Sequence, residues 1–130
     1  MRCQAMWVSL VFVAIVPLGC KPALNQVNEF DLPPDGSHDF EMPDIGKEQK
    51  VQVQVTSTAN VNVFVYFEKD KKAAERDLVN PKKESTNFVA KSVGQKEATL
   101  EATIPADTKW IVHVTPASGV TAKVVVKITN

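Results

Sequence analysis

The sequence predicts an all-β domain, an antiparallel β-sandwich of six to eight short strands that follows an N-terminal signal helix and a flexible tether. Three observations predict it. Valines alternate with polar residues over 51–55, which is the period of a half-buried strand. Turn-forming residues interrupt the chain at 93–95, 105–107 and 116–119. The one helix candidate, residues 69–80, is short, which argues against a βαβ fold.

The first twenty residues predict export. Arg2 and the α-amino group supply positive charge, and an apolar run follows over 5–16. A membrane-spanning helix needs about 20 apolar residues, so this run is too short to span and fits a signal peptide instead. Pro17 ends the helix because it lacks an N–H donor. We expect residues 1–19 to be the signal peptide.

The end of this segment, Val-Pro-Leu-Gly-Cys at 16–20, resembles the lipobox of bacterial lipoproteins. The resemblance implies that Cys20 carries a diacylglycerol and begins the mature chain, which would face the periplasm or the cell exterior. An ordinary secretory signal, with Cys20 incidental, is the alternative. Cys3 would be removed with the signal, so the mature chain would have one cysteine and no internal disulfide.

Residues 20–37 read as the lipidated N-terminus and a flexible tether, because Pro33, Pro34, Asp35 and Gly36 favour turns over packed structure. Residues 38–130 then form the predicted β-sandwich domain, which is long enough for a single core.

Within that domain the strands are predicted in order from the apolar alternation. Residues 51–56 and 61–67 read as a hairpin that turns at Ala59-Asn60, and the second strand is apolar on both faces and therefore central. Residues 69–80 form a helical turn on the next connection. The other expected strands are 39–42, 86–92, 97–104, 109–115 and 122–129.

Four stretches of residues 38–130 resemble the bacterial pre-peptidase C-terminal domain: 46–55, 60–65, 102–114 and 124–128. The first opens with a glycine, a polar spacer and an alternating valine strand, and the last two are similar to the closing strands of that family. The resemblance implies a β-sandwich of jelly-roll-like topology found on exported proteins. The whole chain is also similar to small bacterial lipoproteins, a likeness that implies no activity.

Two groups of aromatic and acidic residues are candidate sites. Tyr66 and Trp110, together with Phe64, would form an exposed platform for a sugar or a peptide; the alternative is that they pack between strands. The second group could bind a cation through carboxylate oxygens, but its spacing matches no calcium loop, so a solvated acidic segment is favoured and no metal is expected. It consists of Asp35, His38, Asp39, Glu41 and Asp44.

No catalytic constellation is expected. His113 is a lone strand histidine, which is more often a surface residue than a general base. Glu97 and Glu101 would share a face of a regular strand, but nothing indicates a cleft between them. The serines lack the Gly-x-Ser-x-Gly setting of a hydrolase, and no cofactor is expected.

Charge is balanced overall but unevenly distributed. Residues 29–48 hold seven acidic residues and one lysine, a net charge of −6 (1 − 7). The lysines and arginine of residues 69–83 alternate with acidic residues, so they predict a mixed soluble surface and no nucleic-acid partner.

The sequence therefore predicts a non-catalytic envelope lipoprotein, anchored to the membrane by its lipid, with a β-sandwich that binds an envelope protein or a polysaccharide. The alternative is an accessory subunit or inhibitor of an exported enzyme, and a carbohydrate-binding module is the less favoured hypothesis.

Overall fold

The computed structural model describes residues 24–130, which form six antiparallel strands and one short helical segment. The predicted all-β class is confirmed. The strands are β1 (Asn25–Leu32), β2 (His38–Met42), β3 (Gln49–Phe67), β4 (Ala90–Ile104), β5 (Trp110–Pro116) and β6 (Ala122–Thr129). The 3₁₀ turn η2 (Glu68–Asp70) and helix α2 (Lys71–Asp77) follow β3. No helix in this part of the chain is long and apolar enough to span a membrane.

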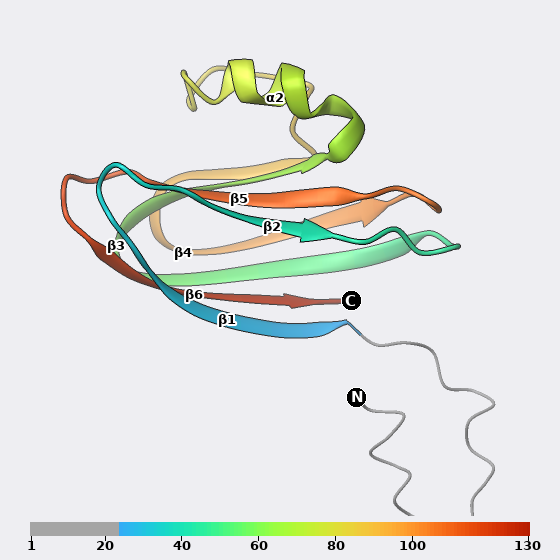
Figure 1. Cartoon of the computed structure of the whole chain (residues 1–130), viewed down its shortest axis with the longest axis horizontal. Helices are drawn as coiled ribbons and strands as arrows, with labels where there is room; N and C mark the ends of the chain where they lie inside the picture. Colours follow the sequence, from blue (N-terminus) through green and yellow to red (C-terminus); the bar gives the residue numbers. More distant parts are fainter. Residues whose placement is uncertain (1–23) are drawn as a thin grey trace, which may run out of the picture.

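Strand β3 organises the sheet. Along one edge it pairs with β4; along the other it pairs with β6 over residues 52–57 and with β5 over residues 61–67. Strands β5 and β6 therefore share one edge of β3 and separate where β3 bends. The sheet, ordered β1-β6-β3-β5-β2, curls into two facing layers (Figure 1).

The bend of β3 replaces the predicted hairpin, which is wrong. Between Thr56 and Val61 strand β3 advances five residues, while β4 advances only two, from Glu97 to Gln95. The inward alternation continues through Ala59, which is buried. A two-residue hairpin turn favours glycine, or asparagine followed by glycine, and Ala59-Asn60 offers neither combination. The chain therefore bulges and continues as one long strand.

Strand β4 likewise merges two predicted strands. The expected break at 93–95 is a β-bulge, with one extra β4 residue between the pairs of Val61 and Val63. Gly94 takes a left-handed backbone conformation there, with φ of 69°, which favours glycine. Its N–H donates to Oδ1 of the buried Asn62 at 2.9 Å, and Nδ2 of Asn62 donates to Thr115 Oγ1 at 3.3 Å. Asn62 thus links β4, β3 and β5 beside the bend.

Strand β1 lies inside the predicted tether of residues 20–37, so that prediction is wrong for residues 25–32. All eight residues of β1 pair with β6, from Asn25 opposite Thr129 to Leu32 opposite Ala122. The side chain of Leu32 is fully buried. The predicted signal peptide, residues 1–19, and the proposed lipid site, Cys20, lie outside the described residues.

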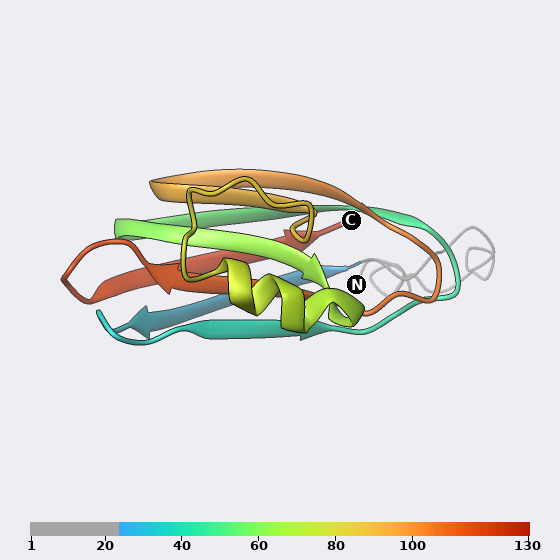
Figure 2. The same cartoon turned by 90° about the horizontal axis from the view of Figure 1, so that it is seen from above.

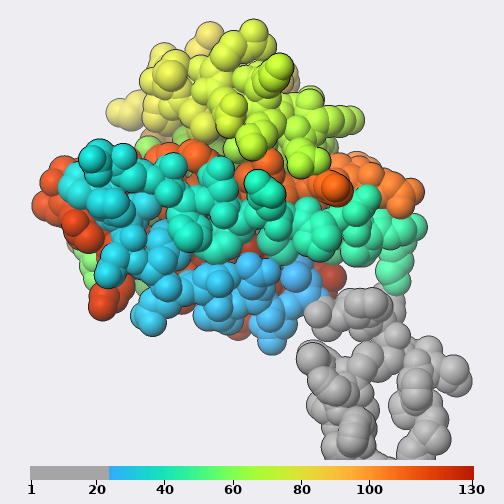
Figure 3. Space-filling model, in the orientation of Figure 1, coloured from blue at the N-terminus to red at the C-terminus, as the bar shows by residue number. Residues whose placement is uncertain are grey.

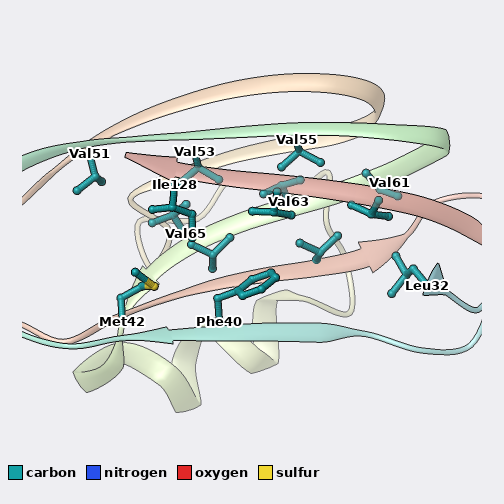
Figure 4. Packing of buried hydrophobic residues seen from close by; sticks show 14 of the residues in the cluster. Leu32, Phe40, Met42, Val51, Val53, Val55, Val61, Val63, Val65 and Ile128 are labelled. Atoms are coloured by element: carbon teal, nitrogen blue, oxygen red, sulfur yellow. The ribbon is translucent and has the colours of Figure 1, made fainter. Parts of the chain in front are cut away.

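The main core lies between the two layers and is built largely from valines (Figure 4). A second apolar cluster lies on the outer face of β3 and β5, where α2 covers it (Figures 1 and 2). This cover explains why the second half of β3 is apolar on both faces, as predicted for a central strand. The short helix predicted within 69–80 is confirmed over Lys71–Asp77, directly after the 3₁₀ turn Glu68–Asp70. The second cluster contains Phe64, Tyr66, Ala74 and Ile111.

Candidate functional site

The outer face beside α2 brings together a histidine, a carboxylate and two aromatic rings from three strands. His113 on β5 lies between Asp39 of β2 and Phe64 of β3 in the sheet register. Its Nδ1 hydrogen-bonds to Asp39 Oδ1. The rings of Phe64 and Tyr66 lie 6.4 and 6.5 Å from the imidazole, centroid to centroid. The aromatic wall leaves only 12% of the His113 side chain exposed.

The hydroxyl of Tyr66 is the unusual group in this cluster. Tyr66 is completely buried, and its hydroxyl has no hydrogen-bond partner within residues 24–130. Burial, with smaller contributions from the negative charges of Asp39, Glu75 and Glu41, raises the pKa of Tyr66 to about 12. The hydroxyl therefore lies in the field of three carboxylates.

We expect Tyr66 to ionise near pH 12, against an ordinary value of 10.0. It is the chain's only tyrosine, so the ultraviolet absorbance of phenolate reports this residue alone. Because the folded protein holds the proton more tightly, the associated stability is present below pH 10 and lost as the pH rises through about 12. The loss amounts to about 3 kcal/mol. Tyr66→Phe is the control, since it should remove this part of the alkaline destabilisation; titration near 10 would contradict the prediction.

Tyr66 and Trp110 do not form the predicted ligand platform. Trp110 is 1% exposed and belongs to the main core between the layers, whereas Tyr66 belongs to the cluster beneath α2. The two side chains thus lie on opposite faces of the sheet and neither reaches the surface. The interpretation as an exposed platform is wrong, and the alternative that they pack between elements describes them.

The acidic segment around β2 is exposed, but its side chains lie on different faces of the strand. Asp39 and Glu41 lie on the outer face of β2, while His38 stacks on Phe30 of β1 with ring centroids 4.2 Å apart. Within residues 24–130 no group of three or more histidine, cysteine or acidic residues is arranged to hold a metal ion. Within residues 24–130 the side chain of His113 forms a hydrogen bond with that of Asp39. No hydroxyl or thiol group of these residues forms a hydrogen bond with the imidazole.

The connection from α2 to β4 is held over the apolar cluster by polar contacts. Asp77 accepts hydrogen bonds from Ser85 Oγ at 2.5 Å and from Asn87 Nδ2 at 2.8 Å, which lower the pKa of its carboxyl. The ammonium of Lys91 donates to two carbonyl oxygens of the same loop, at 2.7 and 3.0 Å. These bonds keep Phe88 against Phe64, with ring centroids 4.9 Å apart.

A concave region lies where β3 begins and β4 ends. It is an open groove of about 720 Å³ that includes the last two residues of the chain. Its charged lining residues are Lys50 and Glu101, one of each sign. Glu97 also lies exposed on β4, beyond this lining. Glu97 and Glu101, which were expected on one face of the strand, therefore do not both line this groove.

From the sequence, Asp39, His113 and Tyr66 belonged to three separate hypotheses, and Glu75 was not singled out. Only the pairing of β2 with β5 and of β5 with β3 brings the first three together. Residue spacing carries no signal for that order, because Asp39 and His113 are 74 positions apart.

No protein-family model and no curated protein sequence matches the chain. Three solved structures resemble it. The pre-peptidase C-terminal domain of a Bacillus anthracis collagenase has 9% identity and a TM-score of 0.59, over 81% of this chain and 89% of that one. The Yersinia pseudotuberculosis-derived mitogen has 10% identity and a TM-score of 0.51, over 83% and 86%.

The third, Aeromonas hydrophila PliG, a periplasmic inhibitor of g-type lysozyme, has 11% identity and a TM-score of 0.51, over 82% and 84%. At these identities the likeness is one of fold. The predicted resemblance to the pre-peptidase C-terminal domain is confirmed at that level.

Proposed function

We propose that this chain is an exported β-module, anchored through a lipid on Cys20, that binds another protein of the cell envelope and catalyses no reaction itself. The observation that carries the proposal is its fold, which resembles that of a periplasmic lysozyme inhibitor and that of the pre-peptidase C-terminal domain of a collagenase. The signal-like residues 1–19 and the lipobox-like residues 16–20 support export and anchoring.

The surroundings of His113 support a binding role over a catalytic one. Nucleophilic catalysis requires a hydroxyl or thiol within hydrogen-bond reach of the base. The Asp39–His113 pair instead faces aromatic rings in the described structure.

Replacing Cys20 tests the anchor. We expect Cys20→Ser to move the protein from the membrane or detergent phase to the aqueous phase, because it removes the sulfur to which the lipid attaches. Intact-mass measurement of the mature wild-type chain should show the mass of the acyl chains, absent in the variant. Cys3→Ser is the control and should leave partition unchanged. Equal membrane partition of wild type and Cys20→Ser would contradict lipid anchoring.

A second candidate, inhibition of an exported enzyme, is favoured by the resemblance to PliG. The purified chain, added in increasing amounts to g-type lysozyme acting on cell walls, should slow the lysis in proportion to complex formed. An unchanged rate of lysis in the presence of excess protein would exclude g-type lysozyme as the target.

A further inference from the structure

Three carboxylates lie on the outer face of the sheet near Tyr66, close enough to raise its pKa. Glu41 and Tyr66 stand on either side of Ile111 in the sheet register. Asp39 and Glu41 lie on β2 and Glu75 lies on α2, and all three residues are exposed. We call them the carboxylate cluster. His113 pairs with Asp39, and within residues 24–130 no lysine or arginine forms an ion pair with any member. The cluster therefore retains uncompensated negative charge.

The neighbouring surface extends this negative charge. The seven acidic residues between 29 and 48 are all exposed and come from β1, β2 and the segments that follow them. Both strands lie along one open side of the sandwich (Figure 3). Asp31 stands opposite Lys123 of β6 in the sheet register, so this side is predominantly rather than wholly acidic. An excess of one sign attracts partners of the opposite charge and raises their association rate.

The hydroxyl of Tyr66 provides an independent observation. A buried hydroxyl without a partner is unfavourable, so native proteins rarely leave one unsatisfied. Helix α2 lies beside it and contributes a single buried residue, Ala74. A donor group that entered beside α2 would find this oxygen and the carboxylates together.

We propose that the carboxylate cluster binds an arginine side chain of a protein partner, whose guanidinium pairs with the carboxylates and donates a hydrogen bond to the Tyr66 hydroxyl. The planar guanidinium presents five N–H donors, which suits several oxygens better than the single ammonium of lysine does. This inference rests on the proposed function and adds that the partner presents a basic surface.

The test uses an arginine homopeptide as the probe, with lysine and glutamate homopeptides of equal length for comparison. The chain purified from membranes in detergent should bind the arginine peptide best. The variant Asp39→Asn/Glu41→Gln/Glu75→Gln should weaken that binding about tenfold. The control Glu84→Gln/Glu97→Gln/Glu101→Gln removes three exposed carboxylates from the connection after α2 and from β4, and should leave binding unchanged. Equal loss in both variants would overturn the site.

Tyr66 supplies a readout that general charge attraction would not produce. The bound guanidinium should lower the pKa of Tyr66, seen in its absorbance titration, because it offsets the carboxylates. Tyr66→Phe should unfold at an equal or higher temperature than wild type yet bind the arginine peptide more weakly. An unchanged Tyr66 titration with peptide bound, or unchanged affinity in Tyr66→Phe, would overturn the proposal.

The two proposals fail separately. If a defined envelope protein binds wild type and the triple cluster variant equally well, the carboxylate cluster is wrong while the proposed function stands. If the arginine peptide binds at the cluster but Cys20→Ser leaves membrane partition unchanged, the site stands and lipid anchoring fails.

Discussion

A fragment that begins at His38 is expected to lose the cooperative unfolding transition that a fragment beginning at Leu24 retains. The shorter fragment lacks β1, which pairs with β6 over its whole length and buries Leu32 completely. Losing a buried leucine side chain alone costs about 2–5 kcal/mol, and whole domains are stable by only about 5–15 kcal/mol. Loss of the strand also leaves the edge of β6 unpaired.

Thermal and urea unfolding followed by circular dichroism compare the two fragments. Residues 24–130 should show one sigmoidal transition, while residues 38–130 should show none, with a far-ultraviolet spectrum that changes gradually on heating. Equal unfolding midpoints of the two fragments would mean that β1 adds no stability, as expected for the flexible tether predicted over 20–37.

The second large effect is expected from Trp110→Ala. Trp110 is among the largest fully buried side chains, and truncating a buried tryptophan costs about 3–5 kcal/mol. The cost should appear as a lower urea midpoint with little change in slope. Trp110→Phe is the matched control. It keeps an aromatic ring and removes an indole N–H that has no partner within residues 24–130, so it should cost less than the alanine variant.

The same variant separates packing from ligand recognition. A surface residue that stacks on a sugar could be removed with little loss of stability. Should Trp110→Ala unfold at the wild-type midpoint, the buried position of the indole would be contradicted.

The strand periodicity predicted the fold class because apolar alternation depends only on neighbouring residues. It could not distinguish a turn from a bulge at Ala59-Asn60, since both interrupt the pattern and only pairing with β4 shows which one forms. Strand β1 escaped prediction for another reason. Two of its half-buried positions hold the polar residues Gln26 and Asn28. Apolar residues at these positions would have identified the segment as a strand.

The candidate site was less predictable than the fold. Asp39 and His113 meet because β2 and β5 are neighbours in the sheet. Burial of Tyr66 depends likewise on where α2 lies. Such positions follow from the tertiary arrangement, for which residue spacing gives no rule.

The early start of β1 limits how far the module can travel. The N–H of Leu24 donates to Asn130 Oδ1 at 2.9 Å, and this contact with the folded domain lies four residues after Cys20. Four peptide units span at most about 14 Å. With the proposed lipid on Cys20, the domain is confined to a thin layer above the bilayer. Partners in that same layer meet it at a raised effective concentration, whereas an enzyme working deep in the cell wall stays out of reach.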